Sequence, residues 1–296
     1  MNGQTIGEKK PQRGNVVDSH TELFGVIGDP VRHSRSPLMM NHAFRETGIN
    51  GIYAAFHIKP EQLGDFAAGV RAMGIRGVNV TIPHKLDIMR YLDEIDAGAQ
   101  AIGAVNTIVN DNGRLIGYNT DGIGYVRSLK EEAEPELAGK RIIVIGAGGA
   151  ARGIVYALAG EKPASITIVN RTASKAEELA AAFSSMGQLA GESTDRLQEL
   201  CQEADIVINT TSIGMYPHTD ETPANANWLK PGAVACDLIY NPLKTKFLLE
   251  AEQRGCRIHG GLGMFIYQGA YAFEYWTGQP APAGAMREAV LQSLIG

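Results

Sequence analysis

Four groups of polar residues each follow an apolar run, at residues 28–37, 79–85, 103–107 and 118–122. These groups hold the side chains of Ser34, Ser36, Thr81, Lys85, Asn106 and Asp121. An open α/β sheet presents its ligand crevice at the ends of its strands, so the six side chains are expected to meet there. This number of hydroxyl and amide groups suits a small polyhydroxylated ligand.

Ser34 and Ser36 are two residues apart, and this spacing supports two interpretations. In an extended loop, both hydroxyls can converge on one carboxylate. Alternatively, Ser36 caps a helix that begins with Pro37, because Ser is a preferred N-cap and Pro a preferred first-turn residue. From these residues alone, the capping interpretation is favoured.

A glycine-rich segment, residues 146–153, joins a short apolar run to a helical stretch and fits the pattern G-x-G-x-x-G/A. Gly146 would form the tight turn, Gly148 would let the backbone approach a pyrophosphate, and Ala151 would let the helix pack closely on the strand. The start of the helix supplies an anion site. The pattern predicts a dinucleotide-binding site, with a purely structural turn as the alternative.

The next apolar run ends in Asn170, Arg171 and Thr172, with Lys175 one helical turn further. Enzymes that use NAD usually carry Asp or Glu near this point for the ribose 2′-hydroxyl, and none of these residues is acidic. Arg171 can pair with a 2′-phosphate and Lys175 adds a second positive charge, which favours NADP. The alternative is that both are ordinary solvated charges at the start of a helix.

The elements that must position these residues alternate between apolar runs and amphipathic stretches, the order of βα units in a mainly parallel sheet. The expected strands cover residues 23–27, 53–58, 77–82, 141–145, 165–169, 206–209 and 233–238. A helix is expected from Ser36 toward a stop at Gly48. The charged segment 131–136 is expected to be a surface connection near a domain boundary.

Length and composition limit the class of protein. At roughly 150 residues per domain, 296 residues suggest two domains. The formal net charge of −5 gives no reason to expect nucleic acid or an anionic membrane as a partner. The three cysteines form no CxxC pair, which favours a reducing cytoplasm over a disulfide framework.

Two further predictions concern parts of the chain without motifs. Residues 1–22 are polar and lack periodicity, and they are interpreted as a frayed N-terminal extension. No metal site is expected, because the histidines at 33, 42, 57 and 84 share no ligand spacing. No apolar stretch approaches the roughly 18 residues of a membrane span.

The motifs occur in an order that resembles the shikimate dehydrogenases. The resemblance runs from about Phe24 to the C-terminus. It rests on seven ordered motifs that begin at His33, Asn79, Ala104, Asn119, Gly146, Asn170 and Gly261. It implies an α/β fold in two domains: an N-terminal substrate domain with a mainly parallel sheet, residues 23–120 completed by 261–296, and a Rossmann-type NADP-binding domain, residues 121–260.

The resemblance implies reversible NADPH-dependent reduction of 3-dehydroshikimate to shikimate, in the biosynthesis of chorismate and aromatic amino acids, by a monomer or homodimer. Ser34 and Ser36 would hold the substrate carboxylate, and the rest of the substrate site would be Thr81, Lys85, Asn106, Asp121, Tyr240 and Gln268. Lys85 and Asp121 would be the catalytic pair. NADP would contact Gly146, Ala147, Gly148, Gly149, Ala150, Asn170, Arg171, Thr172, Lys175, Leu238 and Gly261.

Two positions depart from the family pattern. Many relatives carry Arg where this chain has Lys175, and a compact ammonium lacks the planar fork that grips a 2′-phosphate, so the NADP preference is expected to be softer. Some relatives carry Met at Leu238, where a different packing contact with the nicotinamide is expected. The N-terminal extension has no counterpart in the family.

The expected chemistry follows from hydride transfer to a ketone. Negative charge develops on the ketone oxygen, so the site must supply a proton and stabilise that oxygen. A lysine ammonium donates well at neutral pH but accepts poorly, so Lys85 needs a partner, and Asp121 is the candidate. Two alternatives stay open: a quinate or quinate/shikimate dehydrogenase, and an NADP-sensing module that has lost catalysis.

Overall fold

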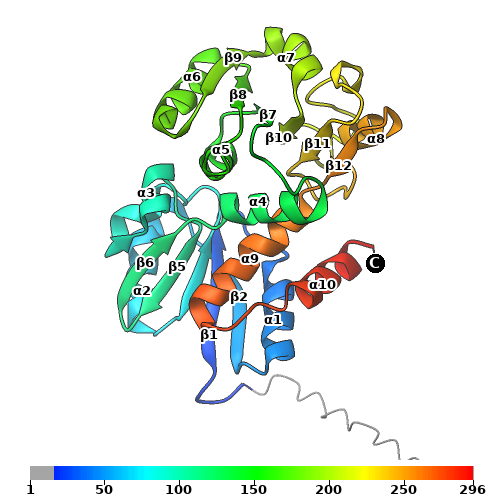
Figure 1. Ribbon diagram of the computed structural model, residues 1–296. Coiled ribbons are helices and arrows are strands. Elements are labelled where there is room, and N and C mark those ends of the chain that lie inside the picture. The colour runs from blue at the N-terminus through cyan, green and yellow to red at the C-terminus, as the bar shows by residue number, and fades with distance from the viewer. Residues whose placement is uncertain (1–16, 296) are drawn as a thin grey trace, which may run out of the picture.

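The computed structural model describes residues 17–295, which form two lobes, each built on a six-stranded sheet (Figure 1). The first sheet contains β1 (Glu22–Gly28), β2 (Gly51–His57), β3 (Gly77–Val80), β4 (Glu94–Ile95), β5 (Thr107–Asp111) and β6 (Arg114–Tyr118). The second contains β7 (Arg141–Ile145), β8 (Ser165–Asn170), β9 (Leu189–Ser193), β10 (Ile206–Asn209), β11 (Val234–Asp237) and β12 (Arg257–His259).

The described helices connect these strands and cover both sheets. They are α1 (Ser36–Thr47), α2 (Leu63–Ala72), α3 (Ala97–Ile102), α4 (Asp121–Glu132), α5 (Gly149–Gly160), α6 (Ala173–Ala182), α7 (Leu197–Glu203), α8 (Lys246–Gln253), α9 (Leu262–Thr277) and α10 (Ala283–Ile295). Short 3₁₀ turns are η1 (Pro60–Gln62), η2 (Asp87–Tyr91), η3 (Ser184–Met186), η4 (Thr194–Arg196) and η5 (Ala226–Trp228). Helix α4 lies between the lobes, and α9 begins beside it and runs down over the first lobe (Figure 1).

The second sheet has the strand order β12-β11-β10-β7-β8-β9, and all of its pairings are parallel. This is the doubly wound order of a Rossmann fold, in which the chain reverses its direction of winding between β7 and β10. Strands that are buried on both faces are rich in β-branched residues, as in Arg141–Ile145. The predicted α/β fold with a Rossmann-type unit is confirmed.

The first sheet has the order β2-β1-β3-β5-β6-β4, and three of its five pairings are parallel. The two antiparallel pairings come from a hairpin, β5–β6, which the expected strands did not include. Its turn is Asn112-Gly113, both with positive φ (50° and 95°). An Asn-Gly pair between two apolar segments is a strong hairpin signal, so this strand pair was predictable.

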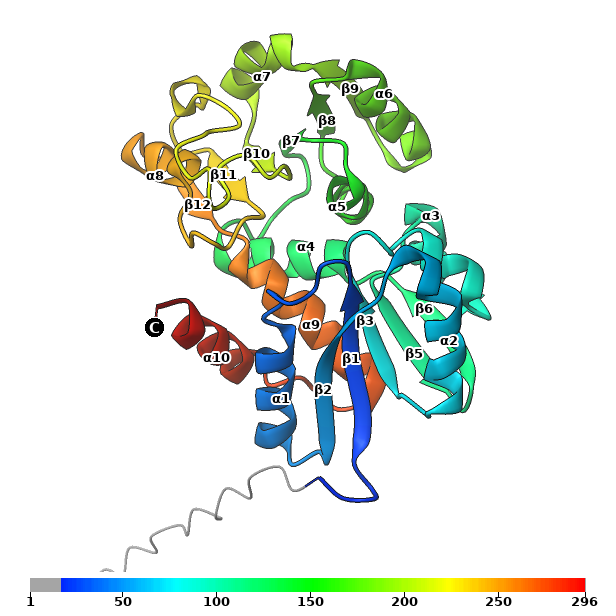
Figure 2. The ribbon, with the colours of Figure 1, turned by 180° about the vertical axis from the view of Figure 1, so that it is seen from behind.

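The C-terminal helices pack on the first sheet, not on the second. Phe273 and Trp276 of α9 and Met286 of α10 share a buried cluster with Phe24 and Phe44. The indole Nε1 of Trp276 donates to the carbonyl of Ile108 at 2.9 Å. Figure 2 shows α10 beside α1.

Two predictions are correct for only part of their residues. Of the predicted extension 1–22, residues 1–16 lie outside the described part of the chain. The rest is not frayed, because Asp18 and Thr21 are hydrogen-bonded to Asn50, at 2.8 and 3.0 Å, and Glu22 begins β1. The segment 131–136 is not simply a surface connection, because it starts inside α4 and its Glu134 is buried. Lys140 and Arg257 pair with Glu134 at 3.2 and 2.6 Å, which compensates the buried charge.

Candidate active site

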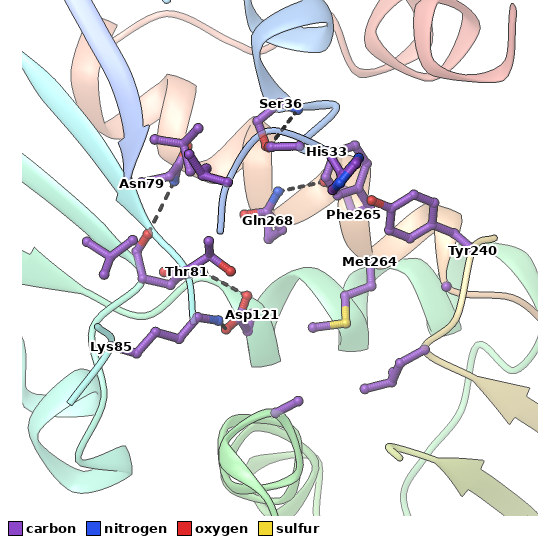
Figure 3. Close-up of a pocket in the computed structure, with 18 of the residues that line it drawn as sticks. His33, Ser36, Asn79, Thr81, Lys85, Asp121, Tyr240, Met264, Phe265 and Gln268 are labelled. Carbon is purple, nitrogen blue, oxygen red and sulfur yellow. Dashed lines mark hydrogen bonds and ion pairs between the residues drawn. The ribbon is translucent and has the colours of Figure 1, made fainter. Parts of the chain in front are cut away.

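A cavity of about 410 Å³ lies between the lobes. It brings together the eight predicted substrate residues: Ser34, Ser36, Thr81, Lys85, Asn106, Asp121, Tyr240 and Gln268. Three residues of the predicted cofactor set also line it: Ala150, Leu238 and Gly261. Figure 3 shows Lys85 and Asp121 pointing toward each other on one wall, with Ser36, Gln268 and Tyr240 on the other side.

Strand direction explains why residues far apart in sequence meet at this cavity. Thr81 follows the end of β3 and Asp121 begins α4 shortly after β6, whereas Asn106 precedes the start of β5. The prediction that Asn106 follows a strand is therefore wrong in detail. Because β5 runs antiparallel to both β3 and β6, its first residue lies at the edge where those strands end.

The Lys85 ammonium lies 2.5 Å from Oδ2 of Asp121, and the two side chains are 22% and 11% exposed. Nδ2 of Asn106 donates to the other carboxylate oxygen, Oδ1, at 2.8 Å. Asp121 is also the first residue of α4, where the helix dipole favours a negative charge. The carboxylate is thus held from three sides, and the ammonium that it holds faces the cavity.

Ser36 does not cap α1, so the favoured interpretation of this residue is wrong. The N-cap is Arg35, and its side chain makes no capping hydrogen bond. The hydroxyl of Ser34 instead accepts from the backbone N–H of Ser36 at 3.2 Å. Ser36 is 8% exposed and its hydroxyl lies beside the phenol of Tyr53, on the cavity wall.

The opposite wall is formed by the segment after β11 and by α9. The ring of Tyr240 stacks on Phe265, with ring centroids 4.9 Å apart. Burial raises the pKa of Tyr240, although the nearby charge of Arg35 acts in the other direction, so the phenol keeps its proton at neutral pH. Nε2 of Gln268 donates to the carbonyl of Phe265 at 2.7 Å.

Sequence reasoning did not place eight of the lining residues at the cavity: Val26, Pro30, Val31, His33, Asn79, Val80, Met264 and Phe265. The signal for Met264 and Phe265 was their position four and three residues before Gln268, which puts them on the same face of a helix. His33 was part of a quoted motif and adjoins Ser34.

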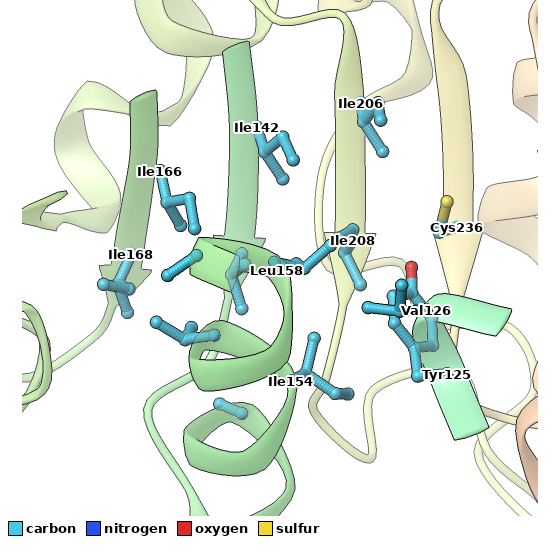
Figure 4. Packing of buried hydrophobic residues seen from close by; sticks show 14 of the residues in the cluster. Tyr125, Val126, Ile142, Ile154, Leu158, Ile166, Ile168, Ile206, Ile208 and Cys236 are labelled. Carbon is cyan, nitrogen blue, oxygen red and sulfur yellow. The ribbon is translucent and has the colours of Figure 1, made fainter. Parts of the chain in front are cut away.

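The glycine-rich turn follows β7 at the reversal point of the second sheet. Gly146 has φ +112°, and a Cβ there would lie 2.5 Å from Oγ1 of Thr210, so only glycine fits. A Cβ at Gly148 would meet nothing within 4 Å, which leaves the backbone open to a ligand. Figure 4 shows Ile154 and Leu158 of α5 packed over this sheet, and Ala151 is fully buried there.

Arg171 and Lys175 lie at the end of β8 and in the first turn of α6, and both are exposed. Within the described residues, neither side chain has a hydrogen-bond or ion-pair partner. Positive charge is unfavourable at the start of a helix, so two unpaired cations there suggest a site for an anionic ligand. The glycine turn and these cations together fit a dinucleotide that carries an extra phosphate.

Neither a metal cluster nor a membrane-spanning helix occurs in the described part of the chain. Among residues 17–295, no three His, Cys, Asp or Glu side chains come together in a way that would hold a metal ion. In the same part of the chain, no helix is long and apolar enough to cross a membrane.

Comparison with known proteins identifies the family. The chain is 50% identical over 280 residues to the shikimate dehydrogenase (NADP(+)) of Geobacillus kaustophilus, a match that covers 92% of this chain and 99% of that protein. The chain belongs to the shikimate dehydrogenase family. Family models for the shikimate dehydrogenase substrate binding domain, for shikimate / quinate 5-dehydrogenase and for the shikimate 5′-dehydrogenase C-terminal domain match residues 26–108, 128–226 and 261–291.

Solved structures of shikimate dehydrogenases share the whole architecture. One, in complex with NADP⁺, is 44% identical with a TM-score of 0.89, over 95% of this chain and 98% of that chain. Another, from Listeria monocytogenes in complex with shikimate and NAD, is 40% identical with a TM-score of 0.88, over 93% of this chain and 98% of that one.

Proposed function

We propose that the protein catalyses the reversible NADPH-dependent reduction of 3-dehydroshikimate to shikimate, an oxidoreductase reaction on a CH–OH group. The observation that carries the proposal is the Lys85–Asp121 pair on the wall of a cavity that Ala150, Leu238 and Gly261 also line. One cavity thus places a proton donor beside the turns expected to bind the cofactor. Family membership supports the same reaction.

Different residues of the cavity wall bind the carboxylate and the ring hydroxyls of the substrate. Ser34 and Ser36 bind its carboxylate, because Ser34 precedes α1, Ser36 begins it, both line the cavity, and the Ser36 hydroxyl is not used as a helix cap. The hydroxyls of the substrate ring meet Thr81, Asn106 and Gln268. Tyr240, which is protonated at neutral pH, supplies one more hydrogen-bond donor.

Bound NADPH would supply the hydride, and the chain's own residues handle the proton. Lys85 donates a proton to the ketone oxygen as negative charge develops on it. Asp121 holds the ammonium in place, and in the oxidative direction it stabilises the charge that returns to Lys85. Lys85 and Asp121 therefore act as one coupled pair.

The cofactor is held by residues 146–150, at the open end of α5, and by the segment from Asn170 to Lys175. Arg171 and Lys175 select NADP over NAD by pairing with the 2′-phosphate. The aliphatic side chain of Leu238 packs against the nicotinamide. We divide the chain accordingly into a substrate domain, residues 23–120 with 261–296, and an NADP-binding domain, residues 121–260.

Two alternatives are separated by the substrate and by turnover. A quinate or quinate/shikimate dehydrogenase would oxidise quinate as well as shikimate. A sensing module would need no proton-transfer pair, so the pairing of Lys85 with Asp121 favours an enzyme over a sensor. Assembly as a monomer or homodimer and a cytoplasmic location stay predictions.

The test is the loss of NADPH absorbance on mixing the protein with 3-dehydroshikimate. Parallel reactions replace NADPH by NADH, or run in reverse with NADP⁺ and either shikimate or quinate. We expect fast NADPH oxidation, slower NADH oxidation and preference for shikimate. Tight NADPH binding without turnover of any substrate would overturn the proposal in favour of the sensing module.

A further inference from the structure

A chain of buried polar side chains runs behind the Lys85–Asp121 pair, from β2 through β3 and β5 to the start of α4. Its members are Tyr53, Asn79, Thr107, Asn106 and Asp121. The hydrogen bonds along it measure 2.7, 3.2, 3.0 and 2.8 Å in that order. Every member is less than 9% exposed, and Tyr53 and Thr107 lie behind the cavity wall that Asn79, Asn106 and Asp121 help to form.

The orientation of the Asn106 amide decides what Asp121 receives. Oδ1 of Asn106 accepts from the backbone N–H of Thr120 at 2.8 Å and from the hydroxyl of Thr107 at 3.0 Å. Nδ2 is then directed to Asp121. A flipped amide would present an oxygen to the carboxylate, and two acceptors would face each other in a buried site.

The hydroxyl of Thr107 lies 3.0 Å from Oδ1 of Asn106 and 3.4 Å from the hydroxyl of Thr120, so the shorter contact of its single proton is with Asn106. Nδ2 of Asn79 donates to Oγ1 of Thr107 and so occupies one of the two acceptor positions of that oxygen. Asn79 is itself oriented, because the phenol of Tyr53 donates to its Oδ1 at 2.7 Å. Donors therefore point the same way along the chain, from Tyr53 to Asp121.

We propose that Thr107 is a positioning residue for the reaction: its hydroxyl holds Asn106 as a donor to Oδ1 of Asp121, which leaves Oδ2 for Lys85. Thr107 does not line the cavity and acts only through Asn106. The inference rests on the proposed function for its effect on turnover, but the hydrogen-bond arrangement itself can be tested without turnover.

The kinetic test uses Thr107→Val, which keeps the shape of the side chain and removes the hydroxyl. We expect kcat to fall by about 10- to 100-fold, the cost of a misplaced catalytic group, with the KM for NADPH within about twofold. Thr107→Ser, which restores the hydroxyl, should recover most of kcat. Thr47→Val, which removes a hydroxyl bonded within α1 to the carbonyl of Ala43, is the control for a general loss of stability.

A double-mutant cycle tests the route. If Thr107 acts through Asn106, Thr107→Val causes no further loss of kcat in the Asn106→Ala background. Equal losses with and without Asn106 would overturn the proposal, and so would a Thr107→Val enzyme with unchanged kcat. If Thr107→Val does not fold, Thr107→Ala takes its place in the same cycle.

A second readout does not depend on activity. The side-chain NH₂ protons of Asn106 are buried and hydrogen-bonded, so their exchange with solvent, measured by NMR, should be slow in the parent protein and in Thr107→Ser. Exchange should be at least about tenfold faster in Thr107→Val. An inactive parent protein with this exchange pattern would reject the proposed function alone, whereas unchanged exchange would reject the role of Thr107.

Discussion

The two sheet edges that meet at the cavity are built in different ways. At the edge of the first sheet, buried side chains such as Asn106 and Asp121 hold one another through hydrogen bonds. At the edge of the second sheet, the turn at Gly146–Gly149 offers backbone and open space, and Arg171 and Lys175 are exposed and unpaired. The first edge is thus arranged before a ligand arrives, and the second offers backbone groups and charge.

This difference matches what each edge has to do. Proton transfer needs donor and acceptor within hydrogen-bond distance and fixed in orientation, which a network of side chains provides. Phosphate groups are bound well by backbone N–H groups and by mobile charges. The second sheet does contain a buried network, in which Asn209 and Thr245 donate to Asp237, but none of the three lines the cavity.

The largest effect should come from breaking the arranged edge at Lys85. We expect Lys85→Ala to lower kcat by about 1,000-fold, because it removes the proposed proton donor, while the affinity for NADPH stays nearly unchanged. Steady-state kinetics and fluorescence titration measure the two quantities. Lys130→Ala, which removes an ammonium from a surface pair with Glu161, serves as the control. A fully active Lys85→Ala enzyme would remove Lys85 from the mechanism.

The stability of the contact between β12 and α4, made by His259 and Ser128, should depend on pH. His259 ends β12, and its Nε2 lies 2.7 Å from Oγ of Ser128 on α4. Burial, with a smaller contribution from the positive charge of Arg287, lowers the pKa of His259 from 6.5 to about 4. His259 is therefore neutral at pH 7, and its 3.7 Å contact with Glu132 is not an ion pair at that pH.

A histidine with a depressed pKa in the folded state stabilises the protein above its unfolded pKa, and this contribution is lost as the pH falls. Each pKa unit corresponds to about 1.4 kcal/mol, so between pH 7 and pH 4 the parent should lose up to about 3 kcal/mol more than His259→Gln. Denaturant unfolding at both pH values measures this, with His20→Gln as an exposed control.

Asp237 makes the opposite contribution, because burial, only partly offset by hydrogen bonds from Ile239, Asn209 and Thr245, raises its pKa from 3.8 to about 6. The stabilisation from Asp237 is present at low pH and lost as the pH rises. Because Asp237 is present in both the parent and His259→Gln, its contribution cancels when the two are compared. If the free energy of unfolding changes with pH in the same way in the parent and in His259→Gln, His259 is not the source of the loss of stability in acid.

The charged edge can be tested by reversing its sign. Arg171→Asp should lower the kcat/KM ratio of NADPH to NADH by about 10- to 100-fold, because a hydrogen-bonded ion pair with the 2′-phosphate is lost and repulsion replaces it. Arg45→Asp, on the exposed side of α1, should leave the ratio unchanged. If the ratio does not change in Arg171→Asp, the 2′-phosphate is recognised elsewhere.

The smallest effect separates the two interpretations of Ser36. Ser36→Ala should raise the KM for shikimate by about tenfold, because one hydrogen bond to a charged group is lost. Since the hydroxyl caps no helix, the Tm should change little. Ser184→Ala, whose hydroxyl bonds the carbonyl of Ala181 away from the cavity, is the control. A lower Tm with unchanged kinetics would restore a structural role for Ser36.

Local features of the sequence were sufficient for the four central strands of the second sheet, whereas its outer strands β9 and β12 were not predicted. The turn at Gly146, the strand Arg141–Ile145 before it and the helix after it are all short-range consequences of residue type. The two cations after β8 could likewise be located from their distance to that strand. Such features depend on backbone sterics and on the 3.6-residue and 2-residue periods, and these are determined by residues close together in the sequence.

The arrangement of the first edge was decided by the tertiary structure. The sequence and its family resemblance named Asn106 and Asp121, but not that Asn106 precedes an antiparallel strand or that Thr107 orients its amide. The spacing of Ser34 and Ser36 favoured a helix cap, and only the structure shows that Arg35, not Ser36, is the N-cap residue. The partners concerned lie up to 148 residues apart, as for Thr120 and the carbonyl of Gln268, so only packing of the whole chain brings them together.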